Sequence, residues 1–333
     1  MASTRIVLAA GGTGGHVFPA IATAEELQKQ GFDPVLFTDK RGIKYIRTHN
    51  YKVVQSASPN GIKALLKLKI GFLQSLFAFI KNRPYAVVGF GGYPSFPPLL
   101  AARLLFIRTV LHEQNSIQGK ANRILAKLAN VSASSFPGTG ANYVGNPVRA
   151  DIKPTIYPLI TSKVNVLITG GSQGAKRFAE VAPKALAKFA DEIRVVHQAP
   201  ENLVDVVRQE YAAANIEAEV KSFFDDMPQR LETAHLLIAR SGASTVAELA
   251  MAGRPAIFIP LAIAADDHQR INAEKVVDAG GGWMILEKEL TPDTLSSLLT
   301  EIIPNKLAAA AFNIRSLAKP NAAKDLAELI ING

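Results

Sequence analysis

The chain has 333 residues, of which 48% are hydrophobic, with 37 basic and 28 acidic side chains and no cysteine. At about 150 residues per domain this length indicates two domains, each large enough to bury a core, and the missing cysteine excludes disulfides and cysteine-zinc sites. The charge is uneven, because residues 1–150 carry 18 basic and 5 acidic side chains, a net of +13, whereas residues 151–333 have a net of −4. We therefore expect the first half to meet an anionic partner.

Apolar runs of strand length alternate with helical patterns along both halves, which is typical of βαβ units on a parallel sheet. In the first half the predicted strands are Arg5–Ala10, Pro34–Thr38, Lys52–Ser56, Tyr85–Gly89, Thr109–His112 and Val131–Ser134. In the second half they are Lys163–Thr169, Ile193–Gln198, Ile216–Lys221, His235–Ala239 and Pro255–Ile259. Between the halves, Asp151–Ser162 contains two prolines and no helical period, which predicts a linker. We predict an α/β protein with two Rossmann-like, doubly wound domains, residues 1–150 and 151–319, facing across a cleft.

Two apolar stretches of the first half have nearly the length of a membrane span. Ile62–Ile80 contains three lysines, and Pro84–Ala102 contains four prolines and three glycines, so we expect neither to form a transmembrane helix. The apolar run Ile6–Ala10 is also too short for a secretory signal, and a cytoplasmic protein is expected.

Glycine clusters follow three of the predicted strands, at Gly11–Gly15, Gly89–Gly92 and Gly170–Gly174. Such a cluster lets a phosphate approach the backbone at a helix N-terminus, although each one alone could be an ordinary tight turn. None has the spacing of the dinucleotide fingerprint or of the P-loop, so we expect neither NAD binding nor P-loop chemistry.

Polar side chains at strand ends of the first half are candidates for a site. His16 begins a helix after the first glycine cluster, where the helix end favours a neutral imidazole that can accept a proton or bond a phosphate; a capping role is the alternative. The run His112-Glu113-Gln114-Asn115 ends another strand and could line a ligand cleft or form a plain polar loop. Arg149 could neutralise a phosphate, although a solvated surface charge would look the same.

The second half offers hydroxyl-binding rather than metal-binding patterns. Glu248 follows Arg240–Thr245 into a predicted helix, where it could accept two ribose hydroxyls or simply stabilise the helix N-terminus. Gln269 and Asn272 share one face of another helix and suit sugar hydroxyls. Asp225-Asp226 and Asp266-Asp267 are adjacent pairs and lack the Asp-x-Asp spacing of metal ligands, so we predict no metal site.

Taken together, these motifs resemble the MurG family of N-acetylglucosaminyltransferases of bacterial cell-wall synthesis. The resemblance spans nearly the whole chain, in eight ordered motifs: AGGTGGHVFPA (10–20), GFGGYPS (89–95), HEQN with GKANR (112–123), GNPVR (145–149), GGSQGA (170–175), FFDDM (223–227), RSGASTVAE (240–248) and DDHQRINA (266–273). It implies a GT-B fold, with acceptor and membrane on the first domain and UDP-GlcNAc on the second. The last helix, about residues 320–333, is implied to pack back on the first domain.

The activity that this resemblance implies is inverting transfer of GlcNAc from UDP-GlcNAc to the C4 hydroxyl of the muramyl residue of undecaprenyl-pyrophosphoryl-MurNAc-pentapeptide. That reaction converts lipid I to lipid II in peptidoglycan synthesis, on the cytoplasmic face of the inner membrane, by a peripheral enzyme with no cofactor or metal. His16 is our first choice for the general base and Glu113 our second, and His16 could instead bind the acceptor's diphosphate.

The resemblance also implies the residues that bind UDP-GlcNAc. They are Thr13, Gly14, Gly15, Asn115, Arg149, Ser172, Phe224, Ala243, Ser244, Thr245, Val246, Ala247, Glu248, Gln269 and Asn272. In this assignment the Phe224 backbone meets the uracil, Glu248 the ribose, and Ser172 with Arg149 the diphosphate. Asn115, Gln269 and Asn272 meet the sugar. The loop Pro260–Ala265 departs from the expectation, because it is more apolar than a sugar-binding loop needs.

The excess of positive charge has a candidate explanation in Ile62–Arg83. This segment interleaves large apolar side chains with five basic ones, a composition typical of a helix lying in an anionic membrane surface. An ordinary core-facing helix with snorkelling lysines is the alternative.

Two other classes of protein fit parts of the sequence. Another GT-B enzyme, acting on a glycolipid or an antibiotic, would share the nucleotide motifs but should lack HEQN and the second glycine loop. A nucleic-acid-binding protein would explain the charge, but the aromatic-basic interleaving that stacks on bases is absent, so no nucleic-acid partner is expected.

Overall fold

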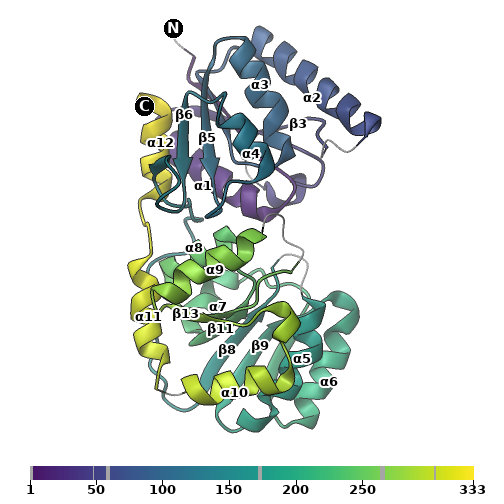
Figure 1. Ribbon diagram of the computed structural model, residues 1–333, viewed down its shortest axis with the longest axis vertical. Coiled ribbons are helices and arrows are strands. Elements are labelled where there is room, and N and C mark those ends of the chain that lie inside the picture. The colour runs from purple at the N-terminus through teal and green to yellow at the C-terminus, as the bar shows by residue number, and fades with distance from the viewer. Residues whose placement is uncertain (1–2, 48, 58–60, 172–174, 263–266, 304) are drawn as a thin grey trace. The chain divides into compact units, whose positions relative to one another are not determined.

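The computed structural model describes residues 3–47, 49–57, 61–171, 175–262, 267–303 and 305–333. The chain divides into two compact units, the first made of residues 1–150 with 319–333 and the second of residues 151–318 (Figure 1). Each unit is a parallel sheet with helices on both faces. The predicted fold class of two doubly wound α/β domains is therefore confirmed.

The sheet of the first unit has the strand order β3-β2-β1-β4-β5-β6-β7, with every neighbouring pair parallel. Its strands are β1 (Arg5–Ala9), β2 (Asp33–Thr38), β3 (Tyr51–Val53), β4 (Ala86–Gly89), β5 (Arg108–Glu113), β6 (Val131–Ser134) and β7 (Asn142–Tyr143). The direction of strand order reverses between β1 and β4, so the loops that follow these two strands open at the position where such sheets bind ligands.

Alternate side chains of the central strand β1 face opposite helical layers. Ile6 and Leu8 pack in the core formed with α1 (Gly14–Lys29) and α12 (Ala322–Asn332). Val7 and Ala9 pack in the core formed with α2 (Ile62–Lys81), α3 (Phe96–Leu104) and α4 (Lys120–Leu125). Both β1 faces are thus buried, which explains why the strand is a continuous apolar run.

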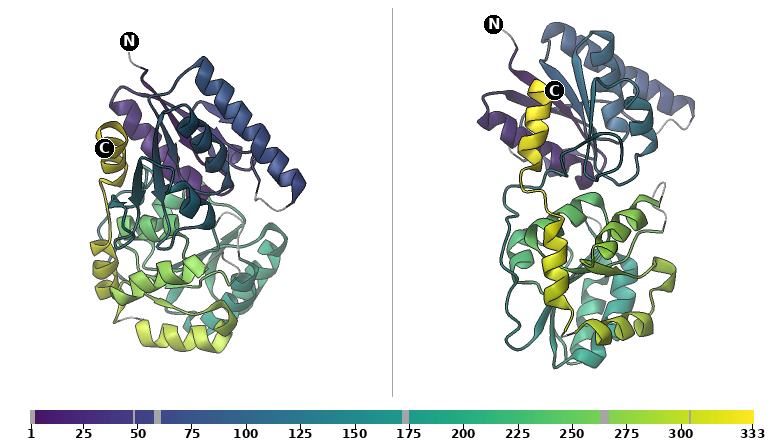
Figure 2. Two further views of the ribbon diagram at one scale, coloured as in Figure 1. Left: turned by 45° about the horizontal axis from the view of Figure 1, so that its top comes forward. Right: turned by 60° about the vertical axis from the view of Figure 1, so that its left-hand side comes forward.

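The last helix of the chain, α12, belongs to the first unit, where Figure 2 shows it in yellow. Leu326, Ala327 and Ile330 are fully buried in the core that includes α1. Arg108 at the start of β5 donates from Nε and Nη2 to the carbonyl oxygens of Ile330 and Leu329, at 2.9 and 3.0 Å. The C-terminal carbonyls of the helix are therefore capped by a side chain of the sheet.

The second unit has the strand order β10-β9-β8-β11-β12-β13, which reverses between β8 and β11. Its strands are β8 (Val164–Thr169), β9 (Ile193–Gln198), β10 (Glu217–Lys221), β11 (Leu236–Ala239), β12 (Ala256–Phe258) and β13 (Gly282–Met284). Its helices are α5 (Lys176–Leu186), α6 (Val204–Ala213), α7 (Met227–Thr233), α8 (Ala243–Ala252), α9 (His268–Asp278), α10 (Pro292–Ile302) and α11 (Leu307–Ser316). The core on one face contains side chains of α5, α6 and α10, while α8 contacts α7, α9 and α11.

Short 3₁₀ helices connect several of these elements. They are η1 (Ile43–Tyr45), η2 (Tyr93–Ser95), η3 (Ala187–Phe189), η4 (Glu201–Leu203) and η6 (Glu287–Glu289). Over the described ranges, no helix has both the length and the apolar character that a bilayer crossing requires.

The predicted linker has no helix or strand, and a buried arginine ties it to the second unit. Arg254 is 0% exposed and donates to Thr155 Oγ1 at 2.8 Å and to the Ile156 carbonyl oxygen at 3.1 Å. It also donates to the carbonyl oxygens of Leu231 and Glu232, at 2.7 and 2.9 Å. Burial lowers the pKa of this guanidinium to about 10, which leaves it charged near neutral pH.

Candidate functional site

The glycine loop after β1 is held in place by a buried carboxylate. Asp39, which follows β2, accepts hydrogen bonds from the backbone N–H groups of Gly12 and Gly42, both at 3.0 Å. Its other oxygen pairs with Arg41 at 2.7 Å, and Arg41 lies beside Gly12. Thr13 is the N-cap of α1, so the loop delivers the chain to a helix N-terminus with a guanidinium nearby, an arrangement suited to an anion.

His16 is the third residue of α1 and partly exposed. Its Nδ1 lies 3.2 Å from Oε1 of Gln114, which follows β5. The loop after β4 covers the imidazole, since a Cβ placed on Gly92 would lie 3.6 Å from Nε2. Loops from β1, β4 and β5 therefore meet around this histidine, beside the reversal of strand order.

Glu113, the last residue of β5, is 3% exposed and organises the loop after its own strand. One carboxylate oxygen accepts from the backbone N–H and the side-chain amide of Asn115, at 2.9 and 3.2 Å. The other accepts from the Gly119 N–H at 3.1 Å and the Asn122 amide at 2.7 Å. A carboxylate with four donors around it is already satisfied, so it is poorly placed to take a proton from a substrate.

Arg149 lies against the first turn of α1. Its guanidinium carbon is 5.0 Å from the centre of the Phe18 ring, and that ring in turn packs edge-on to Tyr45 at 5.4 Å. A Cβ on Gly14 would come within 2.8 Å of the Phe18 ring, so a side chain there would require this ring to move. The first unit thus brings Arg149 and the Thr13–His16 segment to one end of α1.

In the second unit, the segments after β11 and β12 are joined by hydrogen bonds. Asn272 is 0% exposed and donates from Nδ2 to the Ser241 carbonyl oxygen at 3.1 Å, so its amide supports the turn before α8. Gln269 accepts through Oε1 from the Leu261 N–H at 3.0 Å. Glu287 pairs with Arg240 and accepts from the Ala262 N–H at 3.1 Å, which holds residues 260–262 from the other side.

The remaining candidate residues of the second unit differ in whether their side chains are exposed or buried. Glu248 lies in α8 with its side chain partly exposed, as are Ser244, Thr245 and Ala247, whereas Ala243 and Val246 are buried. Ala243 and Val246 therefore have only their backbone atoms to offer a ligand. Ser172 and residues 263–265 of the apolar loop lie outside the described residues.

Phe224 is buried, and its ring is covered by a guanidinium. The Arg230 carbon lies 4.1 Å from the ring centre, and Arg230 pairs with Glu219 at 2.6 Å and with Asp226 at 2.7 Å. The hydrogen bond from Arg230 lowers the pKa of the Asp226 carboxyl. The ring is therefore fixed by an ion-pair network, which leaves the backbone as the part of Phe224 able to contact a base.

No group of three or more histidine, aspartate or glutamate side chains lies in metal-binding proximity in the part of the chain that the structure describes. The sequence placed His112 and Gln114 in a run that could line a ligand cleft but gave neither a role of its own, and it did not single out Arg230 or Glu287. The first two stand in the same motif as Glu113, but the contact between Gln114 and His16 joins residues 98 positions apart. Only the fold brings them together.

The α2 helix presents an apolar and basic surface. Its buried stripe consists largely of small residues, Ala64, Gly71 and Ser75 with Phe79, and a Cβ on Gly71 would lie 1.9 Å from the Gln55 carbonyl oxygen. Several large apolar side chains point outward instead, with Ile62 86%, Phe77 66% and Ile80 62% exposed. One face of α2 thus packs on the core through Phe79, while the opposite face exposes apolar side chains.

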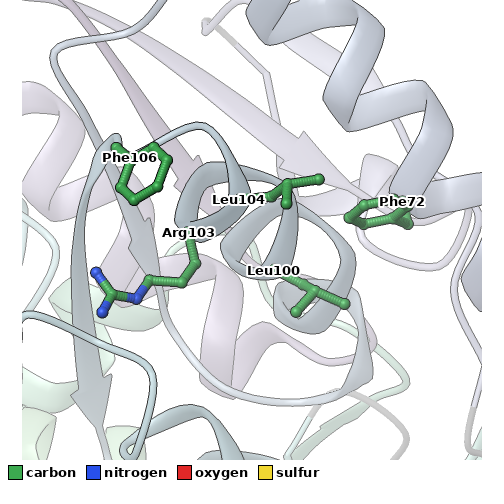
Figure 3. A pocket seen from close by; sticks show the side chains of 5 residues that line it. All are labelled: Phe72, Leu100, Arg103, Leu104 and Phe106. Atoms are coloured by element: carbon green, nitrogen blue, oxygen red, sulfur yellow. The ribbon is translucent and has the colours of Figure 1, made fainter.

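A groove of about 420 Å³ continues this surface between α2 and α3 (Figure 3). Its lining is Phe72, Leu100, Arg103, Leu104 and Phe106. Phe106 is 87% exposed and has a φ of 51°, which is rare for an aromatic residue. We use the term α2 face for the exposed apolar and basic side chains of α2 together with this groove.

Two doubly wound units with ligand-type loops at both strand reversals are the architecture of a GT-B glycosyltransferase. The glycosyltransferase family 28 N-terminal domain matches residues 6–133, and the family 28 C-terminal domain matches residues 165–330. The UDP-N-acetylglucosamine--N-acetylmuramyl-(pentapeptide) pyrophosphoryl-undecaprenol N-acetylglucosamine transferase of Caulobacter vibrioides is 44% identical, over 98% of each chain.

Solved structures agree with this result. The crystal structure of Acinetobacter baumannii MurG superposes with a TM-score of 0.86 at 33% identity, covering 100% of both chains. The glycotransferase of kitacinnamycin superposes with a TM-score of 0.74 at 17% identity over 98% of this chain, a likeness of fold alone. The chain belongs to the MurG family of N-acetylglucosaminyltransferases within glycosyltransferase family 28.

Proposed function

We propose that this protein transfers GlcNAc from UDP-GlcNAc to the C4 hydroxyl of the muramyl residue of undecaprenyl-pyrophosphoryl-MurNAc-pentapeptide, so that lipid I becomes lipid II. The observation that carries this proposal is the full-length similarity, at 40–44% identity, to relatives named as N-acetylglucosamine transferases acting on N-acetylmuramyl-(pentapeptide) pyrophosphoryl-undecaprenol. The architecture supports it, because each sheet has its candidate loops at the strand reversal.

In the proposed reaction the configuration at the anomeric carbon inverts in one displacement. The C4 hydroxyl oxygen bonds to C1 of GlcNAc, the bond from C1 to the UDP oxygen breaks, and UDP leaves with the bonding pair. The hydroxyl proton passes to Nε2 of His16. The charge developing on the diphosphate is met by helix N-termini and by Arg149, so the step needs no metal.

The assignment of the base to His16 rather than Glu113 is supported by their surroundings. The Glu113 carboxylate is buried and accepts four hydrogen bonds from its own loop, whereas His16 is partly exposed and hydrogen-bonded at Nδ1. We assign Glu113 to the shaping of the Asn115 loop. His16 then supplies general-base catalysis, worth about 10²–10⁴ in rate.

For the donor, we retain the contacts that the resemblance implies and refine one of them. Glu248 is proposed to hold the ribose, the Phe224 backbone the uracil, and Ser172 with Arg149 the diphosphate. Gln269 and Asn115 are proposed to meet the sugar. Asn272 is assigned to positioning, since its amide is buried and donates to the Ser241 carbonyl oxygen.

We also propose that the enzyme is peripheral and lies on the anionic cytoplasmic surface of the inner membrane through its α2 face. The exposure of Ile62, Phe77 and Ile80 supports this, as does the run of twelve basic residues without an acidic one between Lys40 and His112. Apolar side chains would enter the headgroup region while lysines and arginines meet lipid phosphates. A lipid-linked acceptor would then reach the first unit from the membrane.

The experiment that tests this function is transfer of radiolabelled GlcNAc from UDP-GlcNAc to the lipid-linked muramyl-pentapeptide by the purified protein. We expect Glu248→Ala to raise KM for UDP-GlcNAc and His16→Ala to lower kcat. Full activity in both variants would overturn the site assignment, and absence of labelled lipid with the wild-type protein would overturn the function.

A further inference from the structure

A chain of hydrogen bonds connects His16 to the interior of the first unit. Its Nδ1 lies 3.2 Å from Gln114 Oε1, and Gln114 Nε2 lies 3.2 Å from His112 Nδ1. His112 Nε2 lies 2.9 Å from the Gly145 carbonyl oxygen. His112 is 0% and Gln114 1% exposed, so bulk water does not compete for the contacts of His112. We refer to the three side chains as the relay.

At the inner end of the relay, the hydrogen bonds of His112 can run in only one direction. The Gly145 carbonyl can only accept, so Nε2 of His112 carries the hydrogen; the Ser135 hydroxyl, 3.5 Å from the same nitrogen, is at the limit of bonding distance. Burial lowers the pKa of His112 to about 4, so the ring is neutral near pH 7. Nδ1 of His112 therefore offers a lone pair and accepts from Gln114.

The donor and acceptor roles at His112 determine how the Gln114 amide is oriented toward His16. Gln114 Nε2 has two acceptors on its side, His112 Nδ1 at 3.2 Å and the His112 carbonyl oxygen at 3.4 Å. Its oxygen must then face His16, and an amide oxygen can only accept. His16 Nδ1 accordingly carries a hydrogen, and the basic lone pair of the neutral ring lies on Nε2.

We propose that Gln114 and His112 are positioning residues for the reaction, which hold His16 as the Nδ1–H tautomer so that Nε2 is the nitrogen that takes the acceptor's proton. This inference rests on the proposed function, in which His16 is the general base. When Nε2 receives the proton, Nδ1–H continues to donate to Gln114, so no member of the relay has to rotate during the step. An amide and a buried neutral imidazole thus take the orienting role that a carboxylate has in hydrolase triads.

Two of the residues that the loop after β4 places against the His16 imidazole are glycines. Gly91 and Gly92 have φ values of +84° and +69°. A Cβ on Gly91 would lie 3.3 Å from Gln114 Oε1 and 3.4 Å from His16 Cε1, and one on Gly92 would lie 3.6 Å from Nε2. A Cβ on Gly91 would crowd Gln114, whereas one on Gly92 would only touch the imidazole. Both positions have the positive φ that favours glycine, so the second glycine motif keeps side chains away from His16.

The tautomer can be read directly by nitrogen NMR of protein labelled with ¹⁵N at its six histidines. Protonated and bare ring nitrogens have well-separated chemical shifts, and His16→Asn assigns the signal. We expect wild-type His16 to carry its hydrogen on Nδ1 at neutral pH. Gln114→Met removes the acceptor and should abolish that preference, while Gln114→Glu keeps an oxygen at Nδ1 and should retain it. Gln28→Met, at an exposed position near the end of α1, is the matched control.

Turnover completes the test. Gln114→Met should lower kcat about tenfold or more with KM for UDP-GlcNAc unchanged, because only the correctly presented base is lost. A wild-type His16 with its hydrogen on Nε2 would overturn the proposal even if Gln114→Met failed to fold. So would a Gln114→Met variant with the wild-type spectrum and kcat. If the tautomer responds as expected but His16→Ala turns over normally, the relay stands as structure and its catalytic use is refuted.

Discussion

Two phenylalanines of α2 allow the proposed membrane binding to be tested apart from folding. Phe77 is 66% exposed, whereas Phe79 is 2% exposed and packs 5.6 Å from the Phe37 ring in the core beneath the sheet. They stand two positions apart on one helix and point to different surroundings. Changing each to serine therefore removes the same ring from the α2 face in one case and from the core in the other.

The two changes should affect different quantities, Phe77→Ser vesicle binding and Phe79→Ser the free energy of unfolding. Phe77→Ser should alter the free energy of unfolding by less than about 0.5 kcal/mol, since the side chain is exposed. Loss of a phenyl ring that enters the membrane costs about 1.5–3 kcal/mol of burial, which is roughly a 10- to 100-fold weaker partition onto vesicles. Phe79→Ser should lower the free energy of unfolding by about 3–5 kcal/mol through the lost contacts and the cavity.

Flotation with phosphatidylglycerol vesicles and urea denaturation measure these two quantities. Phe312→Ser is the matched control, because Phe312 is 77% exposed but lies on α11 of the second unit. It should float like the wild type. If Phe77→Ser also binds vesicles like the wild type, the α2 face does not enter the membrane. If Phe77→Ser destabilises the fold as Phe79→Ser does, the Phe77 side chain is part of the core and is not exposed.

Two further predictions concern buried titratable groups. Burial lowers the pKa of His112 to about 4 and of His197 to about 3, while unfolded histidine titrates near 6.5. Below that pH the unfolded chain binds protons that the folded chain does not, so the free energy of unfolding should fall on acidification by on the order of 1 kcal/mol per pH unit for each histidine. In urea denaturation across this pH range, the free energy of unfolding of His197→Phe should depend less steeply on pH than that of the wild type. A wild type whose free energy of unfolding does not change with pH would contradict this prediction. Arg254→Met should cost about 3 kcal/mol or more, because several buried carbonyl groups lose their donor. Arg194→Met, which removes an exposed ion pair, should cost less than about 1 kcal/mol, and equal losses in both variants would refute the role given to Arg254.

The sequence was sufficient for the fold class, because the buried parallel strands form apolar runs that are hard to mistake. It was insufficient for β7, which has two residues, and for β13, which has three and begins with glycine, since neither is long enough to show a period. Composition predicted the α2 helix but not its orientation. Large apolar residues occur all around that helix, and its buried stripe is marked by small residues instead.

The site shows the same division between local and distant information. The position of His16 at the start of α1 follows from the glycine loop before it, so sequence reasoning could find it. Its partner Gln114 could not be found in this way, because the pair depends on β1 and β5 flanking β4 in the sheet. Glu113 was the second choice for the base, yet in the structure nearby backbone and amide groups of its own loop already satisfy its carboxylate.

The most direct test of the central claim is a single-turnover experiment with excess enzyme, labelled UDP-GlcNAc and the lipid-linked muramyl-pentapeptide. We expect the wild type to place the label in a lipid-linked disaccharide with inverted anomeric configuration, and His16→Ala to form it about 10²-fold more slowly or worse. Retained configuration, labelled lipid formed equally fast by His16→Ala, or release of UDP with no labelled lipid would contradict this claim.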